Sequence, residues 1–455
     1  MKIRYGYFMA ALLGISCQPP GKKNDFKVGL VILDPGHFHA ALVQKSTYTD
    51  VDSNVYVYAP KGPDVQLYLD KINAYNSAAQ KPTNWNEHLY LADDFLEKML
   101  SEKKGSIVVI AGNNNNKTAY IKKSIDAGLN VLADKPMVID AEHFEQLQAA
   151  FASATTRKVL LYDIMTERFE ITNLLQKEFA QIPEIFGVLE KGTSENPAIQ
   201  MESVHYFYKF VSGNILTRPS WFMDVSQQGE AIADVATHLV DLVQWGYFPG
   251  KTIDYRKDIQ INSARRWSTD MTLSQFAAIT KQTAFPAYLQ ENVHDSLLQV
   301  FANGEINYQL MGTHIKLIAK WDYKENEGSG DTHNTLVRGT KANLIIRQGA
   351  AQNYKPTLYI EPADNNTVYE ENLRQQLKKV QLSYPGVELK KADKGWEVII
   401  PEKYKEGHEA HFARVTENFL GYLKNGNMPS WEIPNMLAKY YTTTQALQWA
   451  KKNKD

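Results

Sequence analysis

The chain has 455 residues, with 50 basic and 51 acidic side chains and a formal net charge of −1 at pH 7. This length accommodates two or more domains, each with its own hydrophobic core. A near-neutral chain without a basic run gives no reason to expect nucleic acid or an anionic membrane surface as a partner. The many aromatic residues, including 25 tyrosines, suit a polar ligand with apolar faces, such as a sugar.

The N-terminus has the pattern of an export signal. Basic residues precede an apolar run, 7–15, that is too short to span a bilayer permanently. Cys17 is the only cysteine, which excludes an intrachain disulfide, and it ends a stretch similar to a bacterial lipoprotein cleavage box. We therefore expect 1–24 to be a signal and tether, and the protein to be an exported, lipid-anchored protein that faces the periplasm. An ordinary secretory signal with an incidental cysteine is the alternative.

Residues 25–163 alternate between apolar runs and helical patterns. The expected strands are apolar runs bounded by turn residues, namely 28–33, 54–59, 106–111, 130–133 and 159–162. Helices are expected after residue 40 and at 65–75, 95–103, 118–127 and 142–152, with 76–87 as a loop. This order predicts an α/β, Rossmann-like, doubly wound and mostly parallel sheet. Ligands of such sheets lie beyond the carboxyl ends of the strands, where Gly36, the asparagine run and Lys135 fall.

The order of elements changes after residue 162. Helices are expected at 168–179 and 203–211, and a strand at 185–191. Short strands separated by turns such as Asn303-Gly304 are expected at 259–261, 296–302, 305–310, 314–321, 334–339, 342–347 and 357–361. This spacing predicts an α+β domain over 164–455 with a large, mainly antiparallel open sheet. Two closing helices, 409–424 and 434–451, could pack back on the first domain.

Residues 229–245 are predicted to form a helix with an apolar side and a separate polar stripe. Asp234, His238 and Asp241 are spaced i, i+4 and i+7, which places them together on that stripe. Burying two carboxylates and an imidazole is costly unless they serve a purpose. A proton-transfer group, a metal site and a satisfied core network all remain open.

The turn after the first strand carries only part of a dinucleotide fingerprint. Gly36 is present, but Asp34 and His39 occupy the first and third glycine places. The second strand ends at Ala59, where an acidic residue would normally hold the ribose. Asp34, His37 and His39 could instead ligate a metal, but three close ligands on one tight turn are uncommon, and we expect no metal.

Lys135 follows a buried strand and is expected to point into the crevice. Its ammonium can donate to a substrate hydroxyl and stabilise charge that builds on the oxygen. The alternative is a surface lysine paired with Asp134 or Asp140.

Three stretches carry a combined signature. Residues 110–115 read Ile-Ala-Gly-Asn-Asn-Asn, residues 127–136 read Ala-Gly-Leu-Asn-Val-Leu-Ala-Asp-Lys-Pro, and 229–241 contain the Gly, Asp, His and Asp of the expected helix. Over essentially everything after Asn24, the chain therefore resembles the Gfo/Idh/MocA family of sugar-handling oxidoreductases. The family has Thr-Pro-Asn in the first stretch and Glu in place of Asp134. Residues 34–39, 202–209 and 218–222 further resemble a subgroup of exported oxidoreductases with a distinctive C-terminal region.

The resemblance implies catalytic roles for Lys135, Asp234 and His238 around a sugar or polyol carbon that faces a nicotinamide ring. His238 would take the hydroxyl proton as hydride leaves, since the pKa of imidazole lies near working pH. Lys135 would hold the same oxygen, and Asp234 would orient the imidazole or bind another hydroxyl. Asp241 would support the helix.

The resemblance also implies two sets of contacts. The expected cofactor contacts are Asp34, Gly36, His37, Phe38, His39, Gly112, Asn113, Asn114, Asn115, Asp134 and Lys135. The expected sugar contacts are His205, Tyr208, Lys209, Trp221 and Asp234, although core aromatics with surface charges are the alternative.

Because nicotinamide cofactors are not freely available outside the cytoplasm, an exported member should hold NAD or NADP tightly, with NAD favoured. The expected function is hydride transfer from a sugar or glycoside hydroxyl. A redox-neutral, NAD-dependent glycoside-cleaving enzyme is one alternative, and a non-catalytic carbohydrate-binding protein on a dehydrogenase scaffold is another. The family also commonly associates through its large sheet, so a homo-oligomer is a further expectation.

Overall fold

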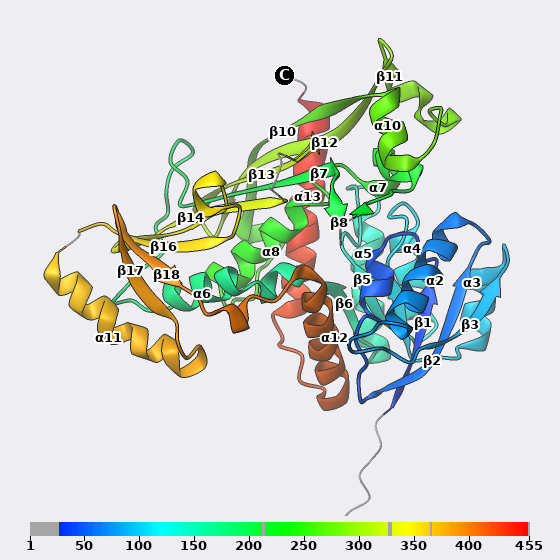
Figure 1. Cartoon of the computed structure of the whole chain (residues 1–455), viewed down its shortest axis with the longest axis horizontal. Coiled ribbons are helices and arrows are strands. Elements are labelled where there is room, and N and C mark those ends of the chain that lie inside the picture. Colours follow the sequence, from blue (N-terminus) through cyan, green and yellow to red (C-terminus); the bar gives the residue numbers. More distant parts are fainter. Residues whose placement is uncertain (1–26, 212–213, 326–329, 365, 454–455) are drawn as a thin grey trace, which may run out of the picture.

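The computed structural model describes residues 27–211, 214–325, 330–364 and 366–453, so the expected signal, the tether and Cys17 lie outside the described residues. Within these ranges the chain forms two sheet-based domains that lie side by side (Figure 1). Among the described helices, none combines the length and apolar character needed to cross a bilayer.

A six-stranded parallel sheet in the order β3-β2-β1-β4-β5-β6 forms the N-terminal domain. Its strands are β1 (Val28–Leu33), β2 (Val51–Ala59), β3 (Asn86–Leu91), β4 (Ile107–Ile110), β5 (Asn130–Asp134) and β6 (Leu161–Ile164). Its helices are α1 (His39–Leu42), α2 (Pro63–Asn76), α3 (Phe95–Glu102), α4 (Lys117–Asp126) and α5 (Phe144–Arg157). The predicted doubly wound sheet is confirmed, and its strand order reverses between β1 and β4, where such sheets bind ligands.

The edge strand β3 was missed in the sequence, where its first residues fell in an expected loop. It begins with the polar residues Asn86, Glu87 and His88 and pairs only with β2. A strand at the sheet edge is not buried on both faces, so it lacks the continuous apolar run that reveals a central parallel strand.

A ten-stranded, mostly antiparallel sheet dominates the second domain, in the order β10-β12-β13-β7-β14-β15-β16-β18-β17, with β11 paired to β12. Its strands are β7 (Ile199–Tyr208), β10 (Ile259–Thr272), β11 (Val293–His294), β12 (Leu297–Leu310), β13 (Thr313–Lys324), β14 (Thr332–Arg338), β15 (Ala342–Arg347), β16 (Thr357–Pro362), β17 (Glu388–Ala392) and β18 (Gly395–Ile399). The short strands β8 (Phe210–Val211) and β9 (Asn214–Ile215) form a separate pair. The predicted large, mainly antiparallel sheet is confirmed; β13 and β7 form a parallel pair within it.

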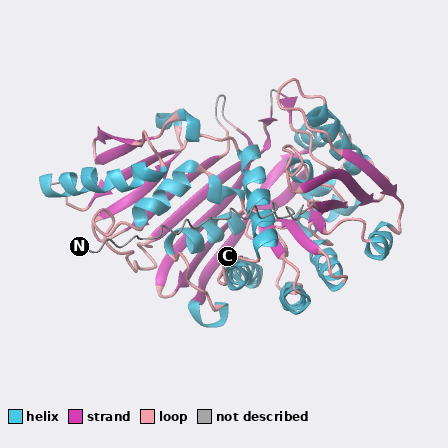
Figure 2. Cartoon of the chain, turned by 90° about the horizontal axis from the view of Figure 1, so that it is seen from below, coloured by secondary structure: helices cyan, strands magenta, loops and turns pink. Residues whose placement is uncertain are grey.

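Helices cover one face of this sheet and fill the space between the domains. They are α6 (Ile171–Ala180), α7 (Val225–Gln228), α8 (Ala236–Tyr247), α9 (Tyr255–Asp258), α10 (Leu273–Thr280), α11 (Thr367–Ser383), α12 (His408–Asn425) and α13 (Glu432–Lys452). Short 3₁₀ helices include η1 (Thr166–Phe169) and η2 (Ser220–Met223). Figure 2, seen from below, shows helices lying across the near face of the large sheet. The closing helices α12 and α13 pack on both domains, against β6 and α5 on one side and β10 on the other (Figure 1).

Two local predictions in the second domain are wrong. Residues 203–211 were expected to be helical, but most of them belong to β7, which lies between β13 and β14. Their aromatic and β-branched side chains favour a strand once neighbouring strands supply the pairing. Residues 185–191 were expected to be a strand, but Gly187 has a φ of +78° in a turn, and Leu189 forms only an isolated bridge to Gly339.

The helix expected at 229–245 begins only at Ala236, because residues 231–235 form turns. Gly304 supports these turns from the sheet, since a Cβ at Gly304 would lie 2.3 Å from Ile232 Cγ1. Asn303-Gly304, expected to be a turn, therefore lies inside β12, where a strand glycine allows close approach. Asp234 precedes the helix and does not share a helical stripe with His238.

Asp241 belongs to a buried ion-pair network that ties the domains together. Arg168 of η1 donates to its two oxygens at 2.6 and 2.8 Å, and Lys439 of α13 donates to it at 2.8 Å. Glu432 lies 3.0 Å from Arg168, and Asp163 of β6 lies 2.7 Å from Lys439. Burial alone would raise the pKa of Asp241, but Arg168 and Lys439 hold it below its usual range.

Replacing Asp241 with alanine is expected to destabilise the fold, because Arg168 and Lys439 would lose a buried partner. We expect the free energy of unfolding to fall by about 3–5 kcal/mol, as measured by denaturant titration with circular dichroism. Asp70→Ala on the exposed face of α2 is the control and should change it by less than about 0.5 kcal/mol. A loss at Asp241 no larger than that of the control would contradict the structural role.

Candidate active site

A cavity of about 500 Å³ lies between the carboxyl edge of the parallel sheet and the second domain. Its lining includes Asp134 and Lys135 from the end of β5, and Gly112 and Asn114 after β4. Seven of the eleven histidines of the chain also line it: His37, His39, His205, His238, His333, His408 and His411. The cavity therefore occupies the position at which this sheet topology binds ligands.

The structure brings Lys135, Asp234 and His238 together on this cavity. Lys135 Nζ donates to Asp234 Oδ1 at 2.6 Å, and Gln228 Nε2 donates to Asp234 Oδ2 at 3.2 Å. Both Asp234 oxygens are thus engaged, and no bond links them to His238 among the described residues. The Nδ1 atom of His238 is buried and has no partner in the described part of the chain.

The environment of His238 favours its neutral form. Burial, together with the nearby Lys135 ammonium, lowers the pKa of His238 well below 6.5. A neutral imidazole has a free lone pair on one ring nitrogen and can accept a proton. His238 therefore has a lone pair available to a hydroxyl group in the cavity, although its lowered pKa makes it a weaker base than the imidazole expected to titrate near working pH.

The first turn keeps the shape of a glycine turn despite its sequence. Asp34 stands at the first glycine place and has a φ of +46°, a conformation that Asp tolerates better than most residues. Gly112 packs directly on this turn, because a Cβ at Gly112 would lie 2.1 Å from the Asp34 carbonyl oxygen. The Asp34 carboxylate accepts a hydrogen bond from Tyr120 at 3.2 Å and lies outside the cavity lining.

Gly36 opens onto a second cavity, of about 410 Å³, which shares His37, Phe38, Arg218, Phe222 and Glu409 with the first. An interdomain hydrogen bond covers this glycine, as Trp221 Nε1 donates to Asp64 Oδ2 at 2.8 Å. A Cβ at Gly36 would lie 3.3 Å from each of these side chains. Trp221, expected to contact sugar, thus lies over the first turn and not in the lining of the main cavity.

Arg218 places a buried positive charge in the walls of both cavities. Its guanidinium donates to the carbonyl oxygens of Tyr206 and Phe207, each at 3.1 Å, and lies 4.6 Å from the ring centre of Phe222. No carboxylate forms an ion pair with it among the described residues. Burial lowers the pKa of Arg218 to about 10, which leaves it charged at neutral pH. An anion at the junction of the cavities would find a charge partner here.

Two of the expected sugar contacts, one on β7 and one directly after it, converge on one carboxylate. His205 Nδ1 lies 3.0 Å and Lys209 Nζ 2.6 Å from Asp331 Oδ2, and all three residues line the main cavity. Tyr208 does not line it, because side chains alternate along a strand and its ring packs beside Tyr323.

The asparagine run after β4 contributes unequally to the cavity. Asn114 lines it and donates through Nδ2 to the Gln228 carbonyl oxygen at 2.7 Å. Asn113 donates to the Gln227 side chain at 2.7 Å, and the exposed Asn115 donates its main-chain N–H to Asn113. These bonds fix α7, and with it the turn that carries Asp234.

Several cavity residues were not singled out as site residues in the sequence. They are Glu167, Arg218, Asp331, His333, His408 and His411. Lys117 lies behind the cavity wall and donates to the Asp134 carbonyl oxygen. His408 and His411, three residues apart at the start of a predicted helix, offered the one usable signal.

Comparisons with known proteins agree with this arrangement. The model described as "Oxidoreductase family, NAD-binding Rossmann fold" matches residues 53–162, and the "Putative oxidoreductase C terminal domain" matches residues 175–451. A crystal structure of a "putative oxidoreductase" from Parabacteroides merdae ATCC 43184 is 52% identical, with a TM-score of 0.92 over 94% of this chain and 98% of that chain. The chain belongs to the Gfo/Idh/MocA oxidoreductase family. The match to the NAD-binding family model begins at residue 53, which lies after the first turn.

More distant structures share the fold of this Gfo/Idh/MocA oxidoreductase. A levoglucosan dehydrogenase solved with NADH and levoglucosan is 12% identical, with a TM-score of 0.59 over 94% of this chain and 98% of that chain. A structure titled "putative myo-inositol dehydrogenase", from Sinorhizobium meliloti 1021, is 12% identical, with a TM-score of 0.54 over 94% and 98%. At such identities the likeness concerns the fold alone. No curated protein matches the chain.

His333, whose ring Nε2 is buried in the cavity wall, predicts a pH-dependent stability. Burial lowers the pKa of His333 to about 4, whereas histidines of an unfolded chain titrate near pH 6.5. As pH falls from about 6.5 to 4, the unfolded state binds protons that the native state does not, so stability is lost. His333 should contribute up to roughly 1.4 kcal/mol per pH unit in this window. Denaturant titrations at several pH values in this range should show that the free energy of unfolding of His333→Gln depends less steeply on pH than that of the wild type. An equally steep dependence would contradict the lowered pKa of His333.

Proposed function

We propose that the protein is an NAD(P)-dependent oxidoreductase that removes hydride from a sugar or glycoside hydroxyl and holds its cofactor tightly. One observation carries the proposal: Lys135, Asp234 and His238 converge on a cavity at the carboxyl edge of the Rossmann sheet. A fold shared with a levoglucosan dehydrogenase solved with NADH and levoglucosan supports the same substrate class.

The polar lining of the cavity supports a ligand with several hydroxyl groups. Five of the eleven buried side-chain polar atoms that lack a partner among the described residues belong to cavity residues, namely Gln228 Oε1, His238 Nδ1, Asp331 Oδ1, His333 Nε2 and His411 Nδ1. All five residues line the cavity. Because buried polar groups normally have hydrogen-bond partners, a polyhydroxylated ligand would satisfy them. The indole of Trp321 and the ring of Phe222 offer apolar faces to the same ligand.

The two adjoining cavities support a dinucleotide as cofactor. Gly112, Asp134 and Lys135 would hold its nicotinamide half in the main cavity, and the second cavity would take the adenosine half. Arg218 would supply a charge partner for the pyrophosphate. Asp64 in the second cavity suits the ribose hydroxyls of NAD better than the 2′-phosphate of NADP. The hydrogen bond between Trp221 and Asp64 covers Gly36 and would have to open for a phosphate to contact this glycine.

In the proposed reaction, the bound nicotinamide supplies the hydride acceptor. Neutral His238 accepts the hydroxyl proton, and Lys135 donates a hydrogen bond to the same oxygen. Asp234 accepts a hydrogen bond from Lys135 and so orients its ammonium, a positioning role that differs from the expected contact with the imidazole.

His238→Ala is expected to lower kcat by about 10²–10⁴-fold, because the proton acceptor is lost. Cofactor binding should remain, since the cofactor is held from β1, β4 and β5. Steady-state kinetics and fluorescence of bound reduced cofactor would measure the two effects. His294→Ala, at an exposed position of β11, is the matched control with unchanged kcat. A fully active His238→Ala variant would refute the base assignment.

Cofactor content distinguishes the proposed enzyme from its alternatives. Protein purified without added cofactor and released with denaturant should yield nicotinamide in an amount close to one per chain. No nicotinamide, and no change of melting temperature with NAD or NADP, would instead indicate a carbohydrate-binding protein. Reduced cofactor formed with a sugar, without bond cleavage, supports the dehydrogenase. Cleavage of a glycoside without net redox would support the glycoside-cleaving enzyme.

We also propose export and membrane anchoring through a lipid on Cys17, and self-association through the large sheet. The export pattern at 1–24 supports the first proposal. For the second, the large sheet carries cross-strand ion pairs that are buried or half-buried, including Lys316 with Glu305 and Lys320 with Glu202. Palmitate labelling of cells that express the chain, and light scattering of the purified protein, would test the two proposals.

A further inference from the structure

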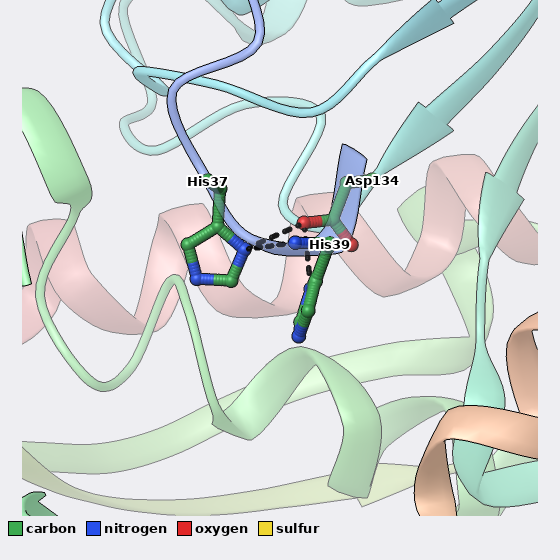
Figure 3. A group of neighbouring side chains, drawn as sticks. All are labelled: His37, His39 and Asp134. Carbon is green, nitrogen blue, oxygen red and sulfur yellow. Dashed lines mark hydrogen bonds and ion pairs between the residues drawn. The ribbon is translucent and has the colours of Figure 1, made fainter. Parts of the chain in front are cut away.

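We propose that His37, His39 and Asp134 bind a divalent transition-metal ion, Zn²⁺ or Fe²⁺, in the wall of the main cavity. The two histidines come from the first turn and the start of α1, and the aspartate ends β5. Figure 3 shows the three side chains converging, and their ligand atoms lie within 4.8 Å of one another.

The distances suit a shared metal ion. Asp134 Oδ2 lies 2.9 Å from His39 Nδ1 and 3.6 Å from His37 Nδ1. Nitrogen and oxygen ligands lie at about 2.0–2.2 Å from Zn²⁺, which separates neighbouring ligand atoms by about 3–3.5 Å. Small side-chain adjustments would therefore place one ion at bonding distance from all three atoms.

The hydrogen bonds leave one contact in this group unexplained. The main-chain N–H of His39 donates to His37 Nδ1 at 3.4 Å, so this nitrogen presents a lone pair. That lone pair lies 3.6 Å from Asp134 Oδ2, which is itself an acceptor. His39 Nδ1 can donate to the carboxylate, but His37 Nδ1 then faces it without a proton between them. A cation held between the three atoms would take the His37 lone pair in place of this long hydrogen bond and displace the proton from His39 Nδ1, and its charge would stabilise the contact.

The surrounding groups keep the ligands available for a metal. Two lysines lie nearby, but each has another partner. Lys117 Nζ donates to the Asp134 carbonyl oxygen at 3.0 Å, and Lys135 pairs with Asp234. The Asp134 carboxylate therefore remains the negative charge closest to the two imidazoles.

The donor set selects the class of ion. Two imidazoles and one carboxylate favour Zn²⁺ or Fe²⁺, whereas Mg²⁺ and Ca²⁺ favour oxygen ligands. All three residues line the cavity, so the remaining coordination positions can take water or a ligand hydroxyl. The site differs from the alternative weighed in the sequence, because Asp34 is bonded to Tyr120 and Asp134 takes its place.

Cobalt titration tests the proposal with the full chain after treatment with a chelator and desalting. Co²⁺ bound by this ligand set gives visible d–d absorption, which should saturate at one ion per chain. His37→Ala and Asp134→Asn should each weaken Co²⁺ binding by more than about tenfold. His143→Ala is the control, because this surface histidine pairs with Asp140 at 2.9 Å and lies outside the cavity. It should bind Co²⁺ like the wild type.

Melting curves select the folded variants for the comparison, and two ligand variants are used in case one fails to fold. Absence of visible absorption in the folded wild-type protein would overturn the proposal. Unchanged Co²⁺ affinity in the folded His37→Ala or Asp134→Asn protein would overturn it as well. Loss of the Co²⁺ spectrum on adding Zn²⁺ supports it. The titration requires neither nicotinamide nor turnover, so its result is independent of the proposed function.

Discussion

The ion pair between Lys135 and Asp234 is the contact on which the site depends. Its atoms lie 2.6 Å apart, and the two side chains are only 11% and 5% exposed. Without this carboxylate, the buried ammonium of Lys135 would lose its hydration and gain no partner in exchange. The end of β5 and the turn before α8 are therefore held in contact. This contact also places His238, in the first turn of α8, beside the end of the parallel sheet.

Helix α8 separates two groups of buried charge with different roles. His238 lines the cavity, whereas Asp241, almost one turn further along α8, lies among Arg168 and Lys439 outside the cavity lining. The second group has complete pairing and fixes the helix between β6 and α13. The cavity group has unpaired atoms, as expected of a surface that binds a ligand. The rigid network therefore supports a site whose polar atoms remain available.

The structural elements that were predicted correctly from the sequence are those that a local pattern of residues determines. Central strands such as β1 and β4 are buried on both faces, and their continuous apolar runs identified the parallel sheet. The segment of β7 was misassigned because its strand character depends on pairing with β13 and β14, which are distant in the chain. Lys135 and His238 were found by motif spacing. Arg218 and Asp331 were missed because long-range packing alone brings them to the cavity.

The glycine-poor first turn is compatible with a dinucleotide because other residues provide the backbone shape and the space that glycines usually provide. Asp34 adopts the required backbone shape, and Gly112 leaves room for it. Helix α1 has only four residues, so its dipole is a weak substitute for a full helix N-terminus. In the proposed enzyme, Arg218 supplies a whole positive charge from the other domain. Cofactor release would then require separating the domain contacts around Arg218 and Trp221, which is a physical reason for tight binding.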